Sequence, residues 1–365
     1  MGKKTDIWPD GRVKNLLGVE HPVVQAPMAS ASTPALVAAV SNAGGLGSFG
    51  AAATPPERLR AIVSEIRRLT DRPFNVNLFA PGVEQASASD AQTQRMRDIL
   101  LPYYDQLGVA CPNDVAAPIG PFDEQFEVLL EERVPVFSFH FGPPPEDAIR
   151  RMKAAGSAVM ASATNLAEAL ELEAAGVDII IAQGSEAGGH RGTYAMPLEQ
   201  SLIGTTALVP LIADAVEVPV IAAGGVMDGR GIRAVMALGA SGVQMGTAFL
   251  GCPENEIPDA YRRAVLSARG DMTAITRVFS GRPARAIQNR FMEEMAHQDG
   301  FLLPFPLQMA YVGPLRKAGA ERSNPDFISM WAGQGVGLAR ALPAGELLAC
   351  LVKEFVKAAT PRAAS

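Results

Sequence analysis

The stretch that decides the fold is VPVIAAGGVMDGRGIRAVMALGASGVQMGT, residues 218–247. It opens with an apolar run at Val218–Ala222 that ends in two glycines, continues with a helix signal from about Arg230, and closes with a second apolar run at Gly242–Met245. Short apolar runs that alternate with helical segments are typical of parallel strands joined by crossover helices. This stretch therefore predicts a β-α-β unit with a glycine-rich turn after each strand.

The same alternation continues outward through most of the chain. Helix signals begin near Pro34, Thr54, Asn165, Thr206 and Arg230, and in Thr54-Pro55-Pro56-Glu57 we expect Thr54 to cap the helix in a capping box. Eight such strands in 365 residues predict an α/β fold, the (β/α)₈ TIM barrel. The eight expected strands are Pro22–Ala26, Gly45–Phe49, Phe74–Phe79, Val134–Phe139, Ala158–Ala161, Val177–Ala182, Val218–Ala222 and Gly242–Met245.

Two long segments interrupt the alternation of strands and helices, at Pro81–Pro121 and from Gly251 to about Pro325. We interpret both as helical insertions that form a small second subdomain. Residues 1–250 and 336–365 are assigned to the barrel, and residues 251–335 to a mainly helical insertion that covers the active-site mouth. A final helix over Ala344–Lys357 is expected to pack on the barrel, with a frayed tail after it.

Composition excludes several classes of protein. The 32 basic and 38 acidic residues give a net charge of −6 without a basic run, and 48% of the residues are hydrophobic, so neither nucleic-acid binding nor disorder is expected. No leader and no apolar segment of membrane-spanning length is evident, which favours a cytoplasmic protein. Cys111, Cys252 and Cys350 are widely spaced, and no cluster has metal-ligand spacing, so neither disulfides nor a metal are expected.

One glycine motif is expected to be structural. The pattern Gly45-x-Gly47-x-x-Gly50 matches the dinucleotide-binding fingerprint, but a helix-like segment precedes it and no helix follows directly, which is the reverse of the required order. These glycines are better explained by close packing of the second strand.

The turns after the seventh and eighth strands predict a phosphate site. Gly224 and Gly225 follow one strand, and Gly246 and Thr247 follow the next and open a short helix. Glycine lets backbone N–H groups approach an anion, and the loops after strands seven and eight of this barrel commonly bind phosphate. The alternative is a pair of tight turns without a ligand.

A histidine in a glycine-rich loop is the main catalytic candidate. The loop Gln183–Gly192, QGSEAGGHRG, follows the sixth strand and carries His190, whose neutral imidazole can accept a proton near neutral pH. Gln183 could donate to a heteroaromatic carbonyl or a ribityl hydroxyl, and Glu186 and Arg191 could pair with one another. His140 and Asn77 end two other strands and are expected to face the same mouth, with Asn75 on the same strand face as Asn77.

Together these motifs resemble the nitronate monooxygenase family. The resemblance spans about residues 19–340 and includes Gln25–Ala29, Asn75–Phe79, Phe279–Arg285 and Trp331–Gly335. It implies non-covalently bound FMN, His190 as the catalytic base, and an alkyl nitronate such as propionate 3-nitronate that is oxidised with O₂ to a carbonyl compound and nitrite. The cofactor contacts expected are Ala26, Pro27, Met28, Asn77, Gln183, Gly188, Gly189, Gly224, Gly225, Gln244, Met245, Gly246 and Thr247, and the substrate contacts are His140 and Trp331.

Other functions remain open at this point because one fold hosts many chemistries. A similar barrel and a similar Glu-Ala-Gly-Gly-His loop occur in flavin-dependent enoyl-acyl-carrier-protein reductases and NADH:quinone reductases. A flavin-binding module without catalysis is a third alternative. The partners expected are a small-molecule nitronate and O₂, with no nucleic acid and no membrane, and the two insertions are candidate surfaces for a homodimer.

Overall fold

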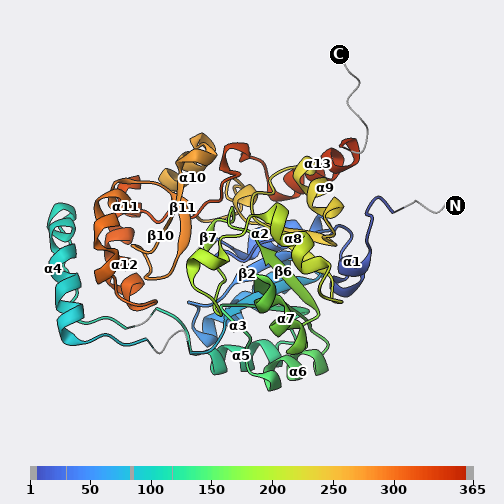
Figure 1. Ribbon diagram of the computed structural model, residues 1–365, viewed down its shortest axis with the longest axis horizontal. Helices are drawn as coiled ribbons and strands as arrows, with labels where there is room; N and C mark the ends of the chain where they lie inside the picture. Colours follow the sequence, from blue (N-terminus) through green and yellow to red (C-terminus); the bar gives the residue numbers. More distant parts are fainter. Residues whose placement is uncertain (1–5, 30, 83–85, 117, 359–365) are drawn as a thin grey trace, which may run out of the picture.

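The computed structural model describes residues 6–29, 31–82, 86–116 and 118–358 (Figure 1). The expectations for the first residues and for the tail lie outside these ranges. Eight parallel strands form one sheet in the order β1-β9-β8-β6-β5-β4-β3-β2, and a bridge between Val24 and Leu46 joins its two edges into a barrel. All eight expected strands are confirmed, with end points within two residues of those expected. They are β1 (Val23–Gln25), β2 (Gly47–Gly50), β3 (Phe74–Phe79), β4 (Val136–His140), β5 (Ala158–Ala163), β6 (Ile179–Gln183), β8 (Val220–Ala223) and β9 (Gly242–Met245).

Amphipathic helices surround the strands, and several begin where their capping residues predict. The side chains of Thr33, Asn165 and Asp228 each accept a hydrogen bond from a backbone N–H in the first turn of the helix that follows. The C-terminal helix α13 has the bounds expected from the sequence. The helices around the barrel are α2 (Pro34–Asn42), α3 (Pro56–Leu69), α5 (Phe122–Glu131), α6 (Glu146–Ala154), α7 (Leu166–Ala174), α8 (Thr205–Ala213), α9 (Gly229–Ala237) and α13 (Ala344–Lys357).

The capping box expected at Thr54 is wrong. Helix α3 begins at Pro56, its N-cap is Pro55, and no side chain caps it. The residue before a proline is disfavoured in the helical region, so Pro56 keeps Pro55 extended, at φ −58° and ψ 149°, and the helix starts one residue too late for Thr54 to cap it.

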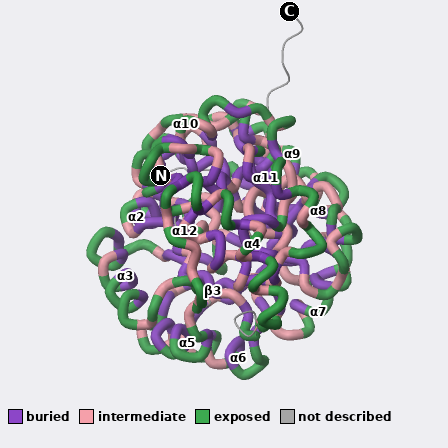
Figure 2. The backbone as a smooth tube through the Cα atoms, turned by 90° about the vertical axis from the view of Figure 1, so that its left-hand side faces the viewer, coloured by how far each residue is buried: buried purple, intermediate pink, exposed green. Residues whose placement is uncertain are grey.

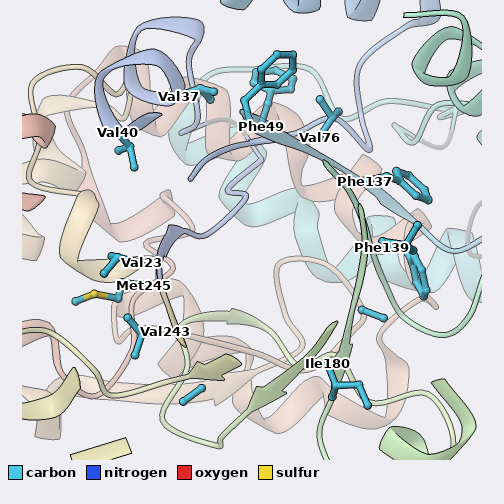
Figure 3. Close-up of a cluster of buried hydrophobic side chains, with 14 of the residues drawn as sticks. Val23, Val37, Val40, Phe49, Val76, Phe137, Phe139, Ile180, Val243 and Met245 are labelled. Atoms are coloured by element: carbon cyan, nitrogen blue, oxygen red, sulfur yellow. The ribbon is translucent and has the colours of Figure 1, made fainter. Parts of the chain in front are cut away.

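The barrel has two apolar layers because strand side chains alternate between its faces. Residues such as Val24, Ile181 and Ile221 fill the interior, which Val13 and Leu17 of α1 (Arg12–Leu17) also join. The opposite strand faces pack against the helices. Figure 3 shows part of this outer layer, in which the labelled residues Val23, Val76, Phe137, Phe139, Ile180 and Val243 are buried.

A second hydrophobic core lies beside the barrel and is built from both insertions. Helix α4 (Asp90–Leu107) lies at the left in Figure 1, next to α12 (Leu307–Glu321). Tyr104 of α4 is buried there and donates a hydrogen bond to the carbonyl of Tyr311. Figure 2 shows that buried and exposed stretches alternate along the chain in this part of the molecule. The remaining helices of this region are α10 (Asp259–Ser267) and α11 (Arg290–Met295).

The second insertion also contains a β-hairpin that the helical expectation did not include. Strands β10 (Thr273–Thr276) and β11 (Ala284–Ile287) pair antiparallel, and β11 pairs with the two-residue strand β7 (Gly189–His190). Four-residue strands separated by glycine, proline and arginine carry too little periodicity to be recognised in the sequence. The hairpin matters because it joins the second core to the loop that carries His190.

The early glycine motif is structural, as expected. Gly47 lies inside β2, and a Cβ there would come within 2.0 Å of the backbone carbonyl oxygen of Val37 in α2. The glycine thus lets strand and helix approach closely. Within the described ranges, no helix is both long and apolar enough to cross a membrane.

Candidate active site

A cavity of about 810 Å³ opens at the C-terminal ends of the barrel strands, and α10, α12 and the 328–335 segment form its other walls. This is the end of the barrel at which such folds carry their chemistry. Every residue that the sequence placed in the site lines the cavity. Those residues are Ala26, Pro27, Met28, Asn77, His140, Gln183, Gly188, Gly189, His190, Gly224, Gly225, Gln244, Met245, Gly246, Thr247 and Trp331.

A ring of polar side chains forms where inward-facing strand positions reach the cavity. Asn77, Ser138 and Gln244 belong to this ring, and Asn75 and Asn77 both donate hydrogen bonds to the Ser138 hydroxyl, at 2.9 and 3.0 Å. The Oε1 atom of Gln244 is buried and has no hydrogen-bond partner. A buried acceptor without a partner is costly, so this atom marks a position for a donor from a bound molecule. Ser138 and Ser162 also line the cavity and were not predicted. Side chains alternate along each strand, so residues on the same face as Asn77 in the neighbouring strands are candidates to face the cavity, and this pattern points to both serines.

Glycines from separate segments pack tightly around one side of the cavity. Gly224 and Gly225 have φ values of 113° and 73°, which side chains rarely tolerate. A Cβ on Gly188 would come within 2.5 Å of the Gly333 backbone nitrogen, and that N–H donates to the Thr247 hydroxyl at 2.9 Å. Segment 333–335 therefore packs against the glycine-rich turns after strands β8 and β9.

The short helix expected after Gly246 is a single 3-10 turn, η3 (Thr247–Phe249). A turn of three residues aligns too few peptide dipoles to act as a helix N-terminus. An anion at this position would be held by individual N–H groups of the glycine-rich backbone and not by a helix N-terminus.

The pairing suggested for Glu186 and Arg191 is wrong. The Glu186 carboxylate accepts hydrogen bonds from the backbone N–H and the hydroxyl of Thr205, at the start of α8. The Arg191 guanidinium is fully buried and donates to backbone carbonyls of Gly184, Gln183 and Ser201. Both side chains hold the loop together, because the exposed donors and acceptors of a tight glycine-rich turn need partners.

Gln183 serves the same loop. Its amide donates to the His190 carbonyl at 3.0 Å and accepts from the Gly192 N–H at 2.8 Å. These two bonds span the loop from one end to the other. The sequence suggested that the Gln183 amide donates to a ligand. In the structure that amide already holds the loop, so a bond to a ligand would compete with its bond to the His190 carbonyl.

His190 is positioned by the hairpin of the second insertion. It pairs with Ala284 of β11, and its Nε2 lies 2.9 Å from the hydroxyl oxygen of Ser280, in the turn between β10 and β11. The Ser280 hydroxyl also lies 3.1 Å from the Arg282 carbonyl, which can only accept. If Ser280 donates to that carbonyl, it accepts from His190 Nε2–H and leaves Nδ1 unprotonated.

Aromatic rings surround the imidazole. The ring centres of Trp331, Phe305 and Phe141 lie 5.3, 5.5 and 5.9 Å from that of His190. These rings come from the barrel, the second insertion and the segment that follows it. Apolar rings on three sides limit the contact of the imidazole with water, and electrostatic interactions are stronger in such a setting.

Both histidines of the site are held in the neutral form. Burial lowers the pKa of His190 to about 3. The adjacent His140 imidazole, beside which a second proton is disfavoured, and the Arg282 and Arg316 guanidinium groups lower it in the same direction. Burial, followed by Arg282, likewise lowers the pKa of His140 to about 3. Since the His140 Nε2 lies 3.4 Å from the His190 carbonyl, it supports the loop that carries His190.

These features define a (β/α)₈-barrel enzyme with a neutral histidine at the mouth of the barrel and a glycine-lined cradle beside it. No group of histidine, cysteine or acidic side chains suited to a metal occurs among the residues that the structure describes. The family described as Nitronate monooxygenase matches residues 11–354, and the chain belongs to that family. The family is flavin-dependent.

Individual relatives match over nearly their full length. A nitronate monooxygenase of Pseudomonas aeruginosa is 47% identical, with 94% of this chain and 99% of that protein covered. A probable nitronate monooxygenase of Staphylococcus aureus strain Newman is 41% identical, with coverages of 96% and 98%. The solved structure of a nitroalkane oxidase from Streptomyces ansochromogenes superimposes with a TM-score of 0.87 at 38% identity, with 96% and 100% of the two chains covered.

The chain is less similar to a second kind of solved structure. FabK from Thermotoga maritima superimposes with a TM-score of 0.74 at 32% identity, and 95% and 96% of the two chains are covered. The overall fold is thus shared with a protein of another name.

Proposed function

We propose that this protein catalyses the FMN-dependent oxidation of alkyl nitronates by O₂ to a carbonyl compound and nitrite. The observation that supports this most is the position of His190, which is neutral, enclosed by aromatic rings and adjacent to the glycine cradle in a chain of the nitronate monooxygenase family. Its substrate partners are then a small nitronate and O₂.

The residues present fit a flavin with one phosphate. Gly224, Gly225 and the 246–247 turn would hold the phosphate, while Gln244, with its unpartnered Oε1, and Asn77 would contact the ring system or the ribityl chain. Ala26, Pro27 and Met28, together with Gly188 and Gly189, line the adjoining walls. We infer FMN rather than FAD because the part of the chain that the structure describes offers one glycine-rich cradle at the cavity, enough for one phosphate. Chromatography of the flavin released on denaturation tests this, and recovery of FAD would contradict it.

A bound flavin would supply the redox chemistry of the site, with the nitronate as electron donor and O₂ as the final acceptor. The protein's own part is to bind, orient and shield the anion. Neutral His190 can accept the α-proton of a nitroalkane through the ring nitrogen that does not face Ser280, and its neutrality avoids trapping the nitronate as an ion pair. Trp331, Phe305 and Phe141 keep water from the reacting carbon.

The deciding experiment follows flavin absorbance without oxygen. We expect bleaching when a nitronate is added and none when NADH is added. Admission of O₂ should restore the oxidised spectrum and release nitrite.

A flavin-dependent NAD(P)H reductase is the second candidate, supported by the similarity to FabK. Bleaching by NADH alone would favour it and contradict our proposal. A response to neither reagent would favour a flavin-binding module without catalysis.

Three further proposals concern the setting of the enzyme. Cys111, Cys252 and Cys350 are free, which suits a reducing compartment such as the cytoplasm.

We propose that residues 251–335 act as the cap of the site, with 1–250 and 336–365 as the barrel. We also propose a homodimer contact through the insertions, which the mass in solution would test.

A further inference from the structure

Phe141 has a backbone conformation that bulky residues rarely adopt. It follows His140 directly after β4, and its φ is 76°, in the left-handed region where a large side chain is strained. Its ring is buried and lies edge-on to that of His190, with ring centres 5.9 Å apart. Strain of this kind persists only where the surrounding contacts fix the residue, and it concentrates at functional sites.

Arg282 supplies a directed contact to this strained residue. It lies in the turn between β10 and β11, and its guanidinium is placed over the Phe141 ring, 3.7 Å from the ring centre. It also donates a hydrogen bond of 2.6 Å to the carbonyl of Thr193, just after the catalytic loop. Phe79 and Phe305 pack on the same ring, but their apolar side chains form no directed bond. One arginine thus joins the hairpin, the end of β4 and the segment after the catalytic loop.

A buried carboxylate holds the same segment from the other element that contacts it. Glu168, in the first turn of α7, is fully buried and accepts hydrogen bonds from the Thr193 hydroxyl and the Tyr194 backbone N–H, at 3.1 and 2.9 Å. Burial lowers the pKa of Arg282 to about 10, and the Glu168 charge opposes this change, so Arg282 stays a cation near neutral pH. A displacement of the segment would break bonds to both charged groups.

Arg282 also belongs to the charges around the catalytic imidazole. Burial is the largest cause of the low pKa of His190. Groups from three elements add to it, in the order His140 at the end of β4, Arg282 in the hairpin turn and Arg316 on α12. Arg282 and Arg191 act in the same direction on His140. A change at Arg282 therefore alters the charge around both histidines of the site.

We propose that Arg282 is a positioning residue of the reaction, which clamps the Phe141 ring and so fixes the wall against which the His190 imidazole is oriented. Arginine suits this role because its planar guanidinium can stack on a ring and donate a hydrogen bond from its edge at the same time. Arg282 acts through Phe141 and His190 and not by contact with the substrate. This inference rests on the proposed function and assigns a further residue to the same site.

The first test measures nitronate oxidation by the FMN-loaded variants Arg282→Met and Phe141→Leu. Each should lower kcat by about 10- to 100-fold, because a displacement of about 1 Å in a reacting group can cost about 100-fold. The KM should change by less than about 3-fold, since neither side chain contributes to binding of the substrate. The double variant should lose no more than the weaker single variant, because both changes release the same wall. Losses that multiply in the double variant, or that appear only in the KM, would overturn the proposal.

A second readout does not depend on turnover. It is the pKa of His190, measured by NMR titration of the FMN-loaded enzyme with labelled histidine. Arg282→Met removes a positive charge that disfavours protonation, so the pKa of His190 should rise by about one unit or more. Arg282→Lys should keep the low pKa and recover only part of kcat, because an ammonium group lacks the planar fork. An unchanged pKa in Arg282→Met would make Arg282 a purely structural residue and contradict the proposal.

Arg290→Met is the matched control. Arg290 lies on α11 in the same insertion, is partly buried like Arg282, and stacks over Phe327 at 5.1 Å. This change should leave the pKa of His190 unaltered and kcat within about 3-fold of the wild type. FMN content and melting temperature are compared in all variants, and Arg282→Lys with Phe141→Leu carries the test if Arg282→Met does not fold. If the wild type oxidised no nitronate but Arg282→Met raised the pKa of His190, the role of Arg282 would stand and the proposed function would fall.

Discussion

At the scale of single residues, the candidate site combines a histidine that the protein keeps neutral with glycines at positive φ, where side chains are strained. Both line the cavity at the barrel mouth, as expected from their positions directly after strands. The protonation state of the histidine could not be predicted from the sequence. It follows from burial and from Arg282 and Arg316, which are distant in the chain.

His190→Asn should separate proton abstraction from anion binding. Asparagine can donate a hydrogen bond but is not a useful base, so oxidation of a neutral nitroalkane should fall by about 10²- to 10⁴-fold. Oxidation of the nitronate should fall less, by about 10- to 150-fold, which corresponds to one charged hydrogen bond. Steady-state kinetics with matched FMN content measures both, and equal nitronate rates in wild type and variant would remove His190 from the site.

Gly225→Val should weaken FMN retention. Gly225 has φ 73°, a conformation that a β-branched residue adopts only with strain, and its backbone belongs to the proposed phosphate cradle. We expect less bound flavin after gel filtration, with the barrel still folded by circular dichroism. Full flavin occupancy would place the phosphate elsewhere.

The two neutral histidines predict how stability depends on pH. Their folded-state pKa of about 3 lies below the unfolded value near 6.5, so below pH 6.5 the unfolded chain binds more protons. Their contribution to the free energy of unfolding is therefore complete above pH 6.5 and is lost as the pH falls toward 3. The melting temperature should decrease from pH 7 to pH 5, and His140→Gln should reduce the decrease. An unchanged slope in that variant would contradict the assignment.

At the scale of elements, the β10–β11 hairpin is the feature that joins the insertion to the chemistry. Strand β11 pairs with the two residues of β7, and the hairpin turn brings Ser280 to the imidazole of His190. The catalytic loop is therefore held from outside the barrel as well as by Gln183 and Arg191 within it.

Ser280→Ala tests this support. Removing the hydroxyl should allow the imidazole to rotate, and the loss of one neutral hydrogen bond corresponds to about 1 kcal/mol, or roughly a 5-fold decrease in kcat. FMN content should not change, because Ser280 lies in the turn between β10 and β11 and does not belong to the loops after β8 and β9 that carry the cradle glycines. A decrease that appears only as flavin loss would show that the hairpin supports the cofactor and not the histidine.

At the scale of the whole molecule, two cores cooperate to form one cavity. The barrel supplies the cradle and the polar ring, while the second core holds α12, and with it Arg316, over the mouth. Helix α4 comes from a separate insertion and packs on α12, so the position of that wall depends on segments about two hundred residues apart in the chain.

Leu315→Ala should destabilise this second core. Leu315 is fully buried, and such truncations cost about 2–5 kcal/mol of unfolding free energy. Leu101→Ala on α4 is the control, because Leu101 is 47% exposed and its loss should cost less than about 0.5 kcal/mol. Denaturant unfolding of both variants measures the difference, and similar midpoints would mean that the second core contributes little.

The sequence by itself determined the local part of this architecture. Periodicity of apolar residues located all eight barrel strands, and glycines after strands marked the cradle, because backbone conformation and side-chain alternation are short-range properties. The prediction of capping residues was less reliable. Thr54 does not cap helix α3, because the helix begins at Pro56 and Pro55 is its N-cap. His190 was recognisable because a polar residue after a barrel strand must face the mouth.

Only the tertiary structure decided what surrounds that histidine. The contact of Ser280, the aromatic rings of Phe305 and Trp331, and the unpaired charge of Arg316 come from segments that meet only when the insertions pack. No local pattern marks them, because α12 is an ordinary helix in sequence and the hairpin strands are too short to show a period. Burial, which sets the pKa of His190 and leaves Arg316 without a partner, is a property of the packed molecule and not of any segment of it.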